Sequence, residues 1–286
     1  QTRLWLHARL IDAPDAYHIT ERLALTGPLD VHALRLACDA LIARHEALRT
    51  TFDEAQDGVA QTIHAPLRCP WRETDLEALP DAQRAARAEA VATADEAEPF
   101  DLGTAPLVRA HLVRFDATHH WLALTVHHIV SDGWSSGVML SELAAFYRAY
   151  ASGEPVPLAP LPIQYADYAL WQRRWLDAGE RDRQLAFWRE RLDPQRGVLT
   201  LPGATARPAR RSARGARHVF SLDARTGAQL RAFAAASGAT PFAVLLAALD
   251  ALLARATGDA RICVGVPAAN RERAEVAGLI GFFVNT

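Results

Sequence analysis

Cysteine is scarce in this chain, whose 286 residues contain only Cys38, Cys69 and Cys263. An odd number of cysteines without the paired spacing of zinc ligands argues against a disulfide framework and favours free thiols in a reducing compartment. Long apolar runs are lacking too, and no basic, apolar and small-residue segment opens the chain. The sequence therefore predicts no membrane span and a cytoplasmic location.

An excess of charge of one sign is also lacking. The chain has 31 Lys and Arg against 33 Asp and Glu, a formal net charge of -2 at pH 7. This balance gives no electrostatic reason to expect binding to nucleic acid or to an anionic membrane. With 50% hydrophobic and 22% charged residues, the composition is that of a globular chain long enough for two cores.

Apolar and ionisable residues meet in the stretch 121–135. Its apolar run, 122–126, predicts a buried strand that ends at the pair His127 and His128. Adjacent side chains of a strand point to opposite faces, so the two histidines cannot converge on one metal ion. We therefore predict no metal site, with one histidine facing a cavity and the other a packed layer.

A turn and a helix follow the histidines. Asp132 and Gly133 predict the turn, and Ser135 can cap the helix. One imidazole could then accept a proton from an attacking group, while backbone N–H groups at Gly133, Trp134 and Ser135 position the substrate or stabilise an oxyanion. The alternative is a pair of core histidines beside an ordinary turn.

Residues 127–133, His-His-Ile-Val-Ser-Asp-Gly, resemble the His-His-x-x-x-Asp-Gly signature of the condensation domains of nonribosomal peptide synthetases, relatives of chloramphenicol acetyltransferase. Four other segments resemble motifs of that family in the same order and with similar spacing. These are residues 1–5, 44–52, 165–172 and 280–286. The resemblance thus extends over the whole chain.

The resemblance implies an α/β fold with two chloramphenicol acetyltransferase-like lobes, of which the second is incomplete, so that we expect a fragment of a longer protein. Residues 1–163 are expected to form the N-terminal lobe with a proline-rich connector, and 164–286 the bridging helices and first part of the C-terminal lobe. Strand-like runs at 219–222 and 262–266 fit that second lobe. The arginine-rich stretch 203–217 is expected to be a loop.

The family also implies roles for individual residues. His128, the second of the pair, would act on the acceptor amine, and His127 would be structural. Asp132 is expected to pair with Arg44 and so fix the turn that bears the histidines.

Four residues of the later motifs are expected at a tunnel or lobe interface: Tyr165, Trp171, Gln172 and Asn285. A helical aromatic stripe is usually core, which is our first interpretation of Trp171, Trp175 and Trp188.

The expected function is amide-bond formation between donor and acceptor acyl or aminoacyl thioesters, in the biosynthesis of a secondary metabolite such as an antibiotic or siderophore. The thioesters would be held on phosphopantetheine arms of carrier proteins, next to an adenylation domain of a larger multimodular chain. The domain itself is expected to bind no cofactor.

Several alternatives remain at this point. A cyclising variant usually carries aspartates in place of the histidine pair, which disfavours it here. Epimerisation domains and dual epimerisation and condensation domains share the signature, although the sequence after Gly133 and the second motif favour condensation. A non-catalytic scaffold that docks carrier proteins and a free-standing acetyl-coenzyme A transferase are the remaining alternatives.

Overall fold

The computed structural model describes residues 1–10, 15–56, 58–192, 198–204, 215–216 and 218–286. The chain divides into two compact units, Gln1–Arg181 with Pro267–Thr286, and Asp182–Val266. This division differs from the expected boundary at 163/164, because the first unit includes the helix from Tyr165 and takes back the chain from Pro267 onwards.

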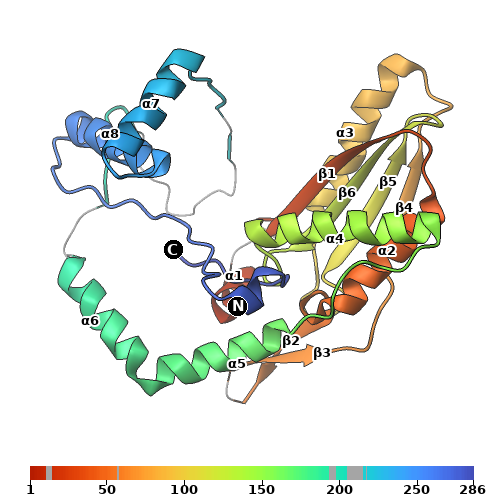
Figure 1. Ribbon diagram of the computed structural model, residues 1–286, viewed down its shortest axis with the longest axis horizontal. Coiled ribbons are helices and arrows are strands. Elements are labelled where there is room, and N and C mark those ends of the chain that lie inside the picture. Colours follow the sequence, from red (N-terminus) through yellow and green to blue (C-terminus); the bar gives the residue numbers. More distant parts are fainter. Residues whose placement is uncertain (11–14, 57, 193–197, 205–214, 217) are drawn as a thin grey trace. The chain divides into compact units, whose positions relative to one another are not determined.

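A mixed four-stranded sheet organises the first unit (Figure 1). In spatial order its strands are β1 (His18–Thr26), β6 (His119–His127), β5 (Val108–Arg114) and β4 (Trp71–Asp75). β6 pairs antiparallel with β1 and with β5, and β4 runs parallel to β5. The predicted strand that leads to the histidine pair is therefore confirmed and lies inside the sheet.

Helices cover both faces of this sheet (Figure 1). α2 (Val31–Arg44) and α4 (Gly133–Ser152) share one core with Leu122 and Leu124 of β6. α3 (Asp81–Ala97) covers the other face, where a smaller apolar cluster forms. The alternating side chains of β6 thus supply both layers, as its apolar composition predicted.

Side-chain caps fix the starts of three helices. The carboxylate of Asp30 accepts a backbone N–H at the start of α2. Asp223 does so for α7 (Ala224–Ala236), and the hydroxyl of Thr240 for α8 (Pro241–Thr257). All three caps are of the residue types that favour the position before a helix.

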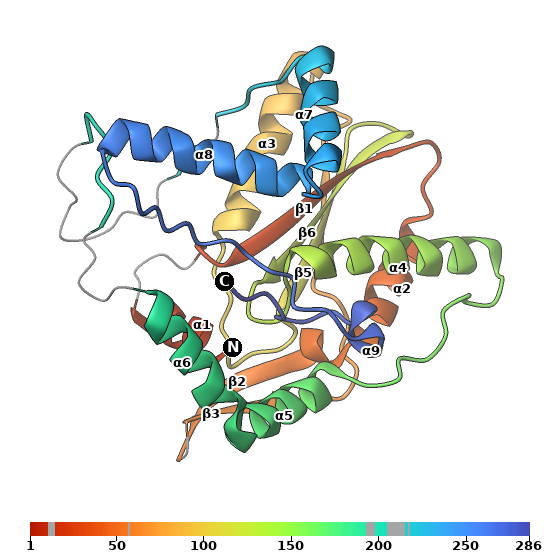
Figure 2. The ribbon, with the colours of Figure 1, turned by 60° about the vertical axis from the view of Figure 1, so that its left-hand side comes forward.

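Short elements complete the first unit. They are α1 (Thr2–Leu10), the 3-10 turn η1 (Glu46–Arg49), the hairpin of β2 (Thr50–Ala55) and β3 (Gly58–Ile63), α5 (Tyr165–Trp175), the π turn η2 (Leu176–Glu180) and α9 (Ala274–Ala277). Figure 2 shows α9 and the chain after it between α4 and α5. The proline-rich stretch 154–164 is neither helix nor strand, as predicted.

The second unit consists mainly of helices. α6 (Arg181–Arg191) leads into it, and α7 and α8 follow. The strands expected at 219–222 and 262–266 are absent, because a strand needs a neighbouring backbone and neither stretch pairs with any described segment of the chain. The arginines of the expected basic loop lie outside the described residues.

The interpretation of the tryptophan stripe as core is wrong. Trp171, Trp175 and Trp188 are 37%, 40% and 50% exposed. Trp171 and Trp175 stack on each other with ring centroids 5.6 Å apart, and the guanidinium of Arg273 lies 4.5 Å from the Trp171 ring centre. Mutual stacking and a cation–π contact thus replace burial for this pair.

Within the described part of the chain, no single helix is long and apolar enough to cross a membrane. α7 and α8 together meet the requirements of length and composition, with a bend of 103° between them.

Candidate active site

The two histidines point to different surroundings, as predicted. The ring of His127 lies among Tyr17, His18 and Phe100, with centroids 6.0 to 6.3 Å away. The ring of His128, just beyond the end of β6, meets Phe282 edge to face at 5.3 Å. The two imidazole rings therefore do not face one common site, as binding of a single metal ion by both would require.

The imidazole of His128 is held in one tautomer. Its Nδ1 lies 2.7 Å from the carbonyl oxygen of Ser131. Since a carbonyl only accepts hydrogen bonds, Nδ1 must carry the proton, and the lone pair of the neutral ring is then on Nε2. No described residue hydrogen-bonds to that Nε2, so it is free to accept a proton from a substrate.

His127 is buried and neutral. Its Nδ1 accepts the backbone N–H of Ile129 at 3.1 Å, and the side chain is almost completely excluded from solvent. Burial, together with the nearby rings of His18 and His128, lowers the pKa of His127 to about 3. Its geometry is that of a structural residue that holds the turn after β6.

The carboxylate of Asp132 is buried and fully occupied. Oδ1 accepts the backbone N–H and the hydroxyl of Ser135 at 2.9 and 2.8 Å, which makes Asp132 the cap of α4 in place of the predicted Ser135. Oδ2 accepts the backbone N–H groups of Phe283 and Val284 at 3.0 and 3.2 Å. Asp132 therefore joins the start of α4 to residues 280–284, which we call the support segment.

The expected ion pair between Arg44 and Asp132 is wrong. The guanidinium of Arg271 lies 3.2 Å from Asp132 Oδ1 and also donates to the carbonyl oxygens of Val276 and Leu279. Burial lowers the pKa of Arg271, and the charge of Asp132 opposes that shift. No sequence pattern points to this partner, because Arg271 stands in a loop without periodicity.

Arg44 instead binds Glu142 of α4. Its Nε donates to both carboxylate oxygens at 3.0 and 3.1 Å. The ring of His45 donates to the same carboxylate at 2.6 Å. Arg44 thus still supports the site, but by fixing α2 to α4 and not by holding the histidine turn.

Ser135 is not available to a substrate. Its side chain is completely buried, and its hydroxyl bonds to Asp132, Arg271 and both backbone groups of Gly281. Its N–H is taken up by the cap, so its expected role in oxyanion stabilisation is wrong. The N–H groups at this helix start that no described residue binds belong to Gly133 and Trp134, and no atom lies within 4 Å of a Cβ built on Gly133.

The support segment is held against α5. The hydroxyl of Tyr165 donates to the carbonyl oxygen of Phe282 at 2.7 Å, and its ring packs edge to face on Phe283. Gly281 lies so close to Tyr165 that an added Cβ would approach that ring to less than 3.0 Å. Burial raises the pKa of Tyr165, so its hydroxyl stays protonated and donating.

Gln164, which sequence analysis did not single out, joins α5 to the end of α2. Its side-chain amide donates to the carbonyl oxygen of Arg44 at 3.0 Å and accepts the N–H of Glu46 at 3.1 Å. A glutamine amide carries both a donor and an acceptor on a flexible stem, but this chemistry gives no recognisable sequence pattern.

The remaining predicted residues of the later motifs make hydrogen bonds and ring contacts with other partners than His128. Gln172 donates to the hydroxyl of Tyr168 at 2.9 Å, next to Trp171 on α5. Asn285 exchanges two backbone hydrogen bonds with Ala268. Whether these residues line a tunnel stays a prediction.

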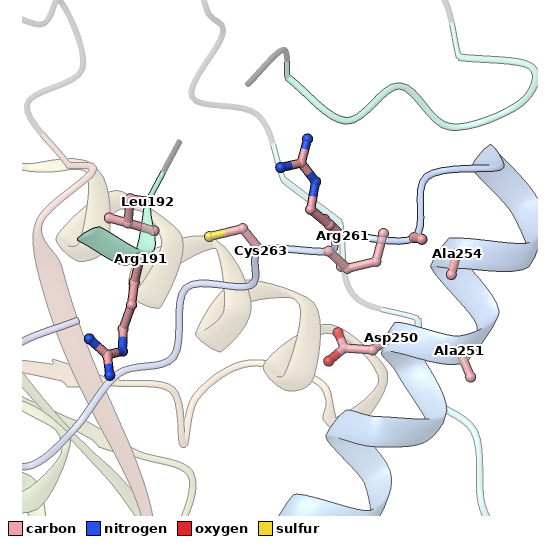
Figure 3. Close-up of a pocket in the computed structure, with 9 residues that line it drawn as sticks. Arg191, Leu192, Asp250, Ala251, Ala254, Arg261 and Cys263 are labelled. Atoms are coloured by element: carbon pink, nitrogen blue, oxygen red, sulfur yellow. The ribbon is translucent and has the colours of Figure 1, made fainter. Parts of the chain in front are cut away.

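A cavity of about 830 Å³ lies in the second unit (Figure 3). Its lining includes Arg191, Asp250 and Cys263. None of the predicted site residues borders it, so volume alone does not mark the site.

The comparisons with known proteins agree on one family. The family model for the condensation domain matches residues 1–286. The chain is 42% identical over 286 residues to a linear gramicidin synthase of Brevibacillus parabrevis, covering 100% of this chain and 4% of that protein. It is 43% identical to phosphinothricin tripeptide synthetase PhsC of Streptomyces viridochromogenes, covering 100% of this chain and 26% of that protein.

Solved structures agree as well. The X-domain from teicoplanin biosynthesis superposes with a TM-score of 0.85 at 33% identity, covering 99% of this chain and 62% of that one. The first condensation domain of the calcium-dependent antibiotic synthetase, solved with a substrate analogue, superposes with a TM-score of 0.79 at 25% identity, covering 99% and 65%.

The chain belongs to the condensation-domain family of the nonribosomal peptide synthetases, and the α/β fold expected from the resemblance is confirmed. It spans about a quarter or less of the length of the named synthetases that it matches.

Proposed function

We propose that this chain forms an amide bond between a donor acyl or aminoacyl thioester and an acceptor amine. Each substrate would be carried on the phosphopantetheine arm of a carrier protein, within a multimodular synthetase in the cytoplasm. The observation that supports this most strongly is the fixed tautomer of His128, whose free Nε2 is the acceptor that an attacking amine requires.

The steps follow from this arrangement. The acceptor nitrogen attacks the thioester carbonyl while His128 Nε2 hydrogen-bonds to, and then removes, the amine proton. The N–H groups of Gly133 and Trp134, at the positive end of α4, face the oxygen that becomes negative. Collapse of the intermediate breaks the carbon–sulfur bond, and the proton passes to the thiolate, which leaves as a thiol.

The test is substitution of His128 in the full-length protein. His128→Ala should reduce amide formation by about 10² or more in a protein that still folds, because it removes a proton-accepting or positioning group whose side chain is only partly buried. His32→Ala, at an exposed position on α2, is the matched control. Equal rates for His128→Ala and the wild type would contradict the proposal.

A second candidate is a non-catalytic scaffold. The X-domain that superposes on this chain has also been solved in complex with OxyB, at 35% identity and a TM-score of 0.81. An assay of both amide product and exchange of the donor Cα hydrogen with deuterium oxide separates the candidates. Condensation gives product alone, epimerisation gives exchange, and a scaffold gives neither.

A further inference from the structure

His45 connects three separate parts of the first unit. It caps the end of α2 and is 1% exposed. Its Nε2 lies 2.6 Å from Glu142 Oε2 on α4, and its Nδ1 lies 3.3 Å from the backbone nitrogen of Ile280, the first residue of the support segment. Both ring nitrogens are thus used, each by a partner distant in sequence.

The direction of these two bonds is fixed. A backbone N–H only donates, so Nδ1 of His45 accepts from Ile280, and Nε2 must carry the proton that it donates to Glu142. Burial lowers the pKa of His45, which keeps the ring neutral as this pattern requires. Arg44 donates to both oxygens of the same carboxylate, so Glu142 is a well-held anchor for the ring.

The support segment has little freedom beyond Ile280. Gly281 is confined by Tyr165, and Phe283 donates its N–H to Asp132. Phe282, between them, places its ring edge to face on His128. A shift at Ile280 is therefore passed along one short, tightly held peptide to the imidazole of His128.

We infer that His45 is a positioning residue for the reaction at His128, acting through its acceptor bond to Ile280. The donor bond to Glu142 orients the ring of His45. The acceptor bond fixes the position of the support-segment backbone, and hence the position of the Phe282 ring beside His128. This inference rests on the proposed function of His128, and it assigns a task to a residue that makes no contact with His128.

Two substitutions separate the two bonds of His45. An asparagine carbonyl oxygen can stand close to the place of Nδ1, so His45→Asn keeps an acceptor for Ile280 and loses the donor to Glu142. A glutamine amide nitrogen can stand close to the place of Nε2, so His45→Gln keeps the donor and loses the acceptor. The two variants are each other's control.

The expected result is a split between rate and stability. His45→Gln should lower kcat about tenfold, since small misplacements of reacting groups are costly, and should speed hydrogen exchange at the Ile280 amide. His45→Asn should keep kcat within about twofold of the wild type and keep the Ile280 amide protected, although its melting temperature falls. Equal kcat values for the two variants, or failure of both to fold, would make His45 purely structural and overturn the inference.

His128→Ala measured in parallel keeps the two proposals apart. If wild type and His128→Ala have equal activity, the proposed function fails, while exchange at Ile280 still reports on the bond to His45. If His128→Ala is inactive and His45→Gln is as active as the wild type, only the inference fails.

Discussion

Asp132 illustrates how much one buried carboxylate can organise. It is 1% exposed, and its two oxygens accept five hydrogen bonds from four residues, including one from the guanidinium of Arg271. A carboxylate with this many donors is stabilised in its charged form. Its role in the site is to hold other groups in place, since no lone pair is left for a substrate.

Replacing Asp132 should therefore unfold the protein more easily. Asp132→Asn leaves the buried charge of Arg271 without a counter-ion and turns an acceptor into a donor, which should lower the free energy of unfolding by about 3–5 kcal/mol. Urea denaturation measures this. Asp81→Asn, which removes a 93% exposed carboxylate paired with Arg84, should change it by less than about 1 kcal/mol. Similar losses for both variants would disprove the importance of the buried pair.

Gly281 offers a steric test. A Cβ there would overlap the ring of Tyr165, and the cost of overpacking should lower the free energy of unfolding by about 1–3 kcal/mol or more in Gly281→Ala. Gly133→Ala has open space around its Cβ and should fold with a melting temperature close to that of the wild type. If both alanine variants melt alike, the close approach of Tyr165 is not a constraint in solution.

His127 should make stability depend on pH. Its pKa is about 3 in the folded protein against 6.5 for an unperturbed histidine, so below pH 6.5 the unfolded chain binds a proton that the folded one does not. Stability from this group is therefore lost as pH falls from 6.5 towards 3, by about 1.4 kcal/mol per pH unit. In His127→Asn the slope of the free energy of unfolding against pH should be smaller, between pH 6 and 4, by about the amount that one bound proton contributes. Unfolding curves at several pH values check this, and parallel slopes would refute it.

Sequence patterns located the site residues better than their partners. The histidine pair and Asp132 stand together in one short motif, which places them. Spacing along α2 puts Arg44 at a helix border but cannot say which of 31 basic residues reaches Asp132. Arg271 stands 139 residues after Asp132, in the segment that returns to the first unit from Pro267 onwards. Only the tertiary structure shows that these two residues meet.

Among the elements, α3 differs from its neighbours in how it is attached. It buries only small apolar residues and Asp95, whereas α4 buries Met139, Leu143 and Phe146. Arginines of the sheet bind carboxylates of α3 and of the residue that ends it, as in the pairs of Arg22 with Glu89 and of Arg72 with Glu98. The docking of α3 thus combines a smaller apolar contact than that of α4 with partly exposed ion pairs.

High salt should loosen α3 selectively. Partly exposed ion pairs weaken as the screening length falls from about 10 Å at 0.1 M to 3 Å at 1 M salt, whereas apolar burial does not weaken. Amide exchange in α3 should then become faster in 1 M sodium chloride, and exchange in α4 should not. Equal changes in the two helices would mean that the ion pairs do not hold α3.

Helix starts were predictable at this scale, and strands were less so. The caps of α2, α7 and α8 are local side-chain contacts, within three residues of the capping side chain, and local sequence patterns identify them. The stretches 219–222 and 262–266 have the composition of strands, but composition cannot supply the neighbouring backbone. The order β1-β6-β5-β4 was beyond prediction for the same reason, since it is set by pairing between distant segments.

For the whole molecule, the division into two units places the His128 site in the unit that has the apolar core. Every residue of the His128 network belongs to the first unit. Among the described residues of the second unit, only Ala234 is buried, and several large apolar side chains are strongly exposed. These include Val219, Phe220, Phe233 and Leu252. The described residues of this unit therefore enclose little apolar core of their own.

The bonds from Asp132 to Phe283 and Val284 join positions 151 and 152 residues apart, and this has a consequence for folding on the ribosome. At a synthesis rate of about 5–20 residues per second, the partners of Asp132 emerge about 8–30 seconds after it. Throughout that interval the strand that carries His127 can already pair with β1, while the carboxylate beside it has no native donors from the support segment. The turn that holds His128 thus reaches its native form only after the whole of the second unit has been translated.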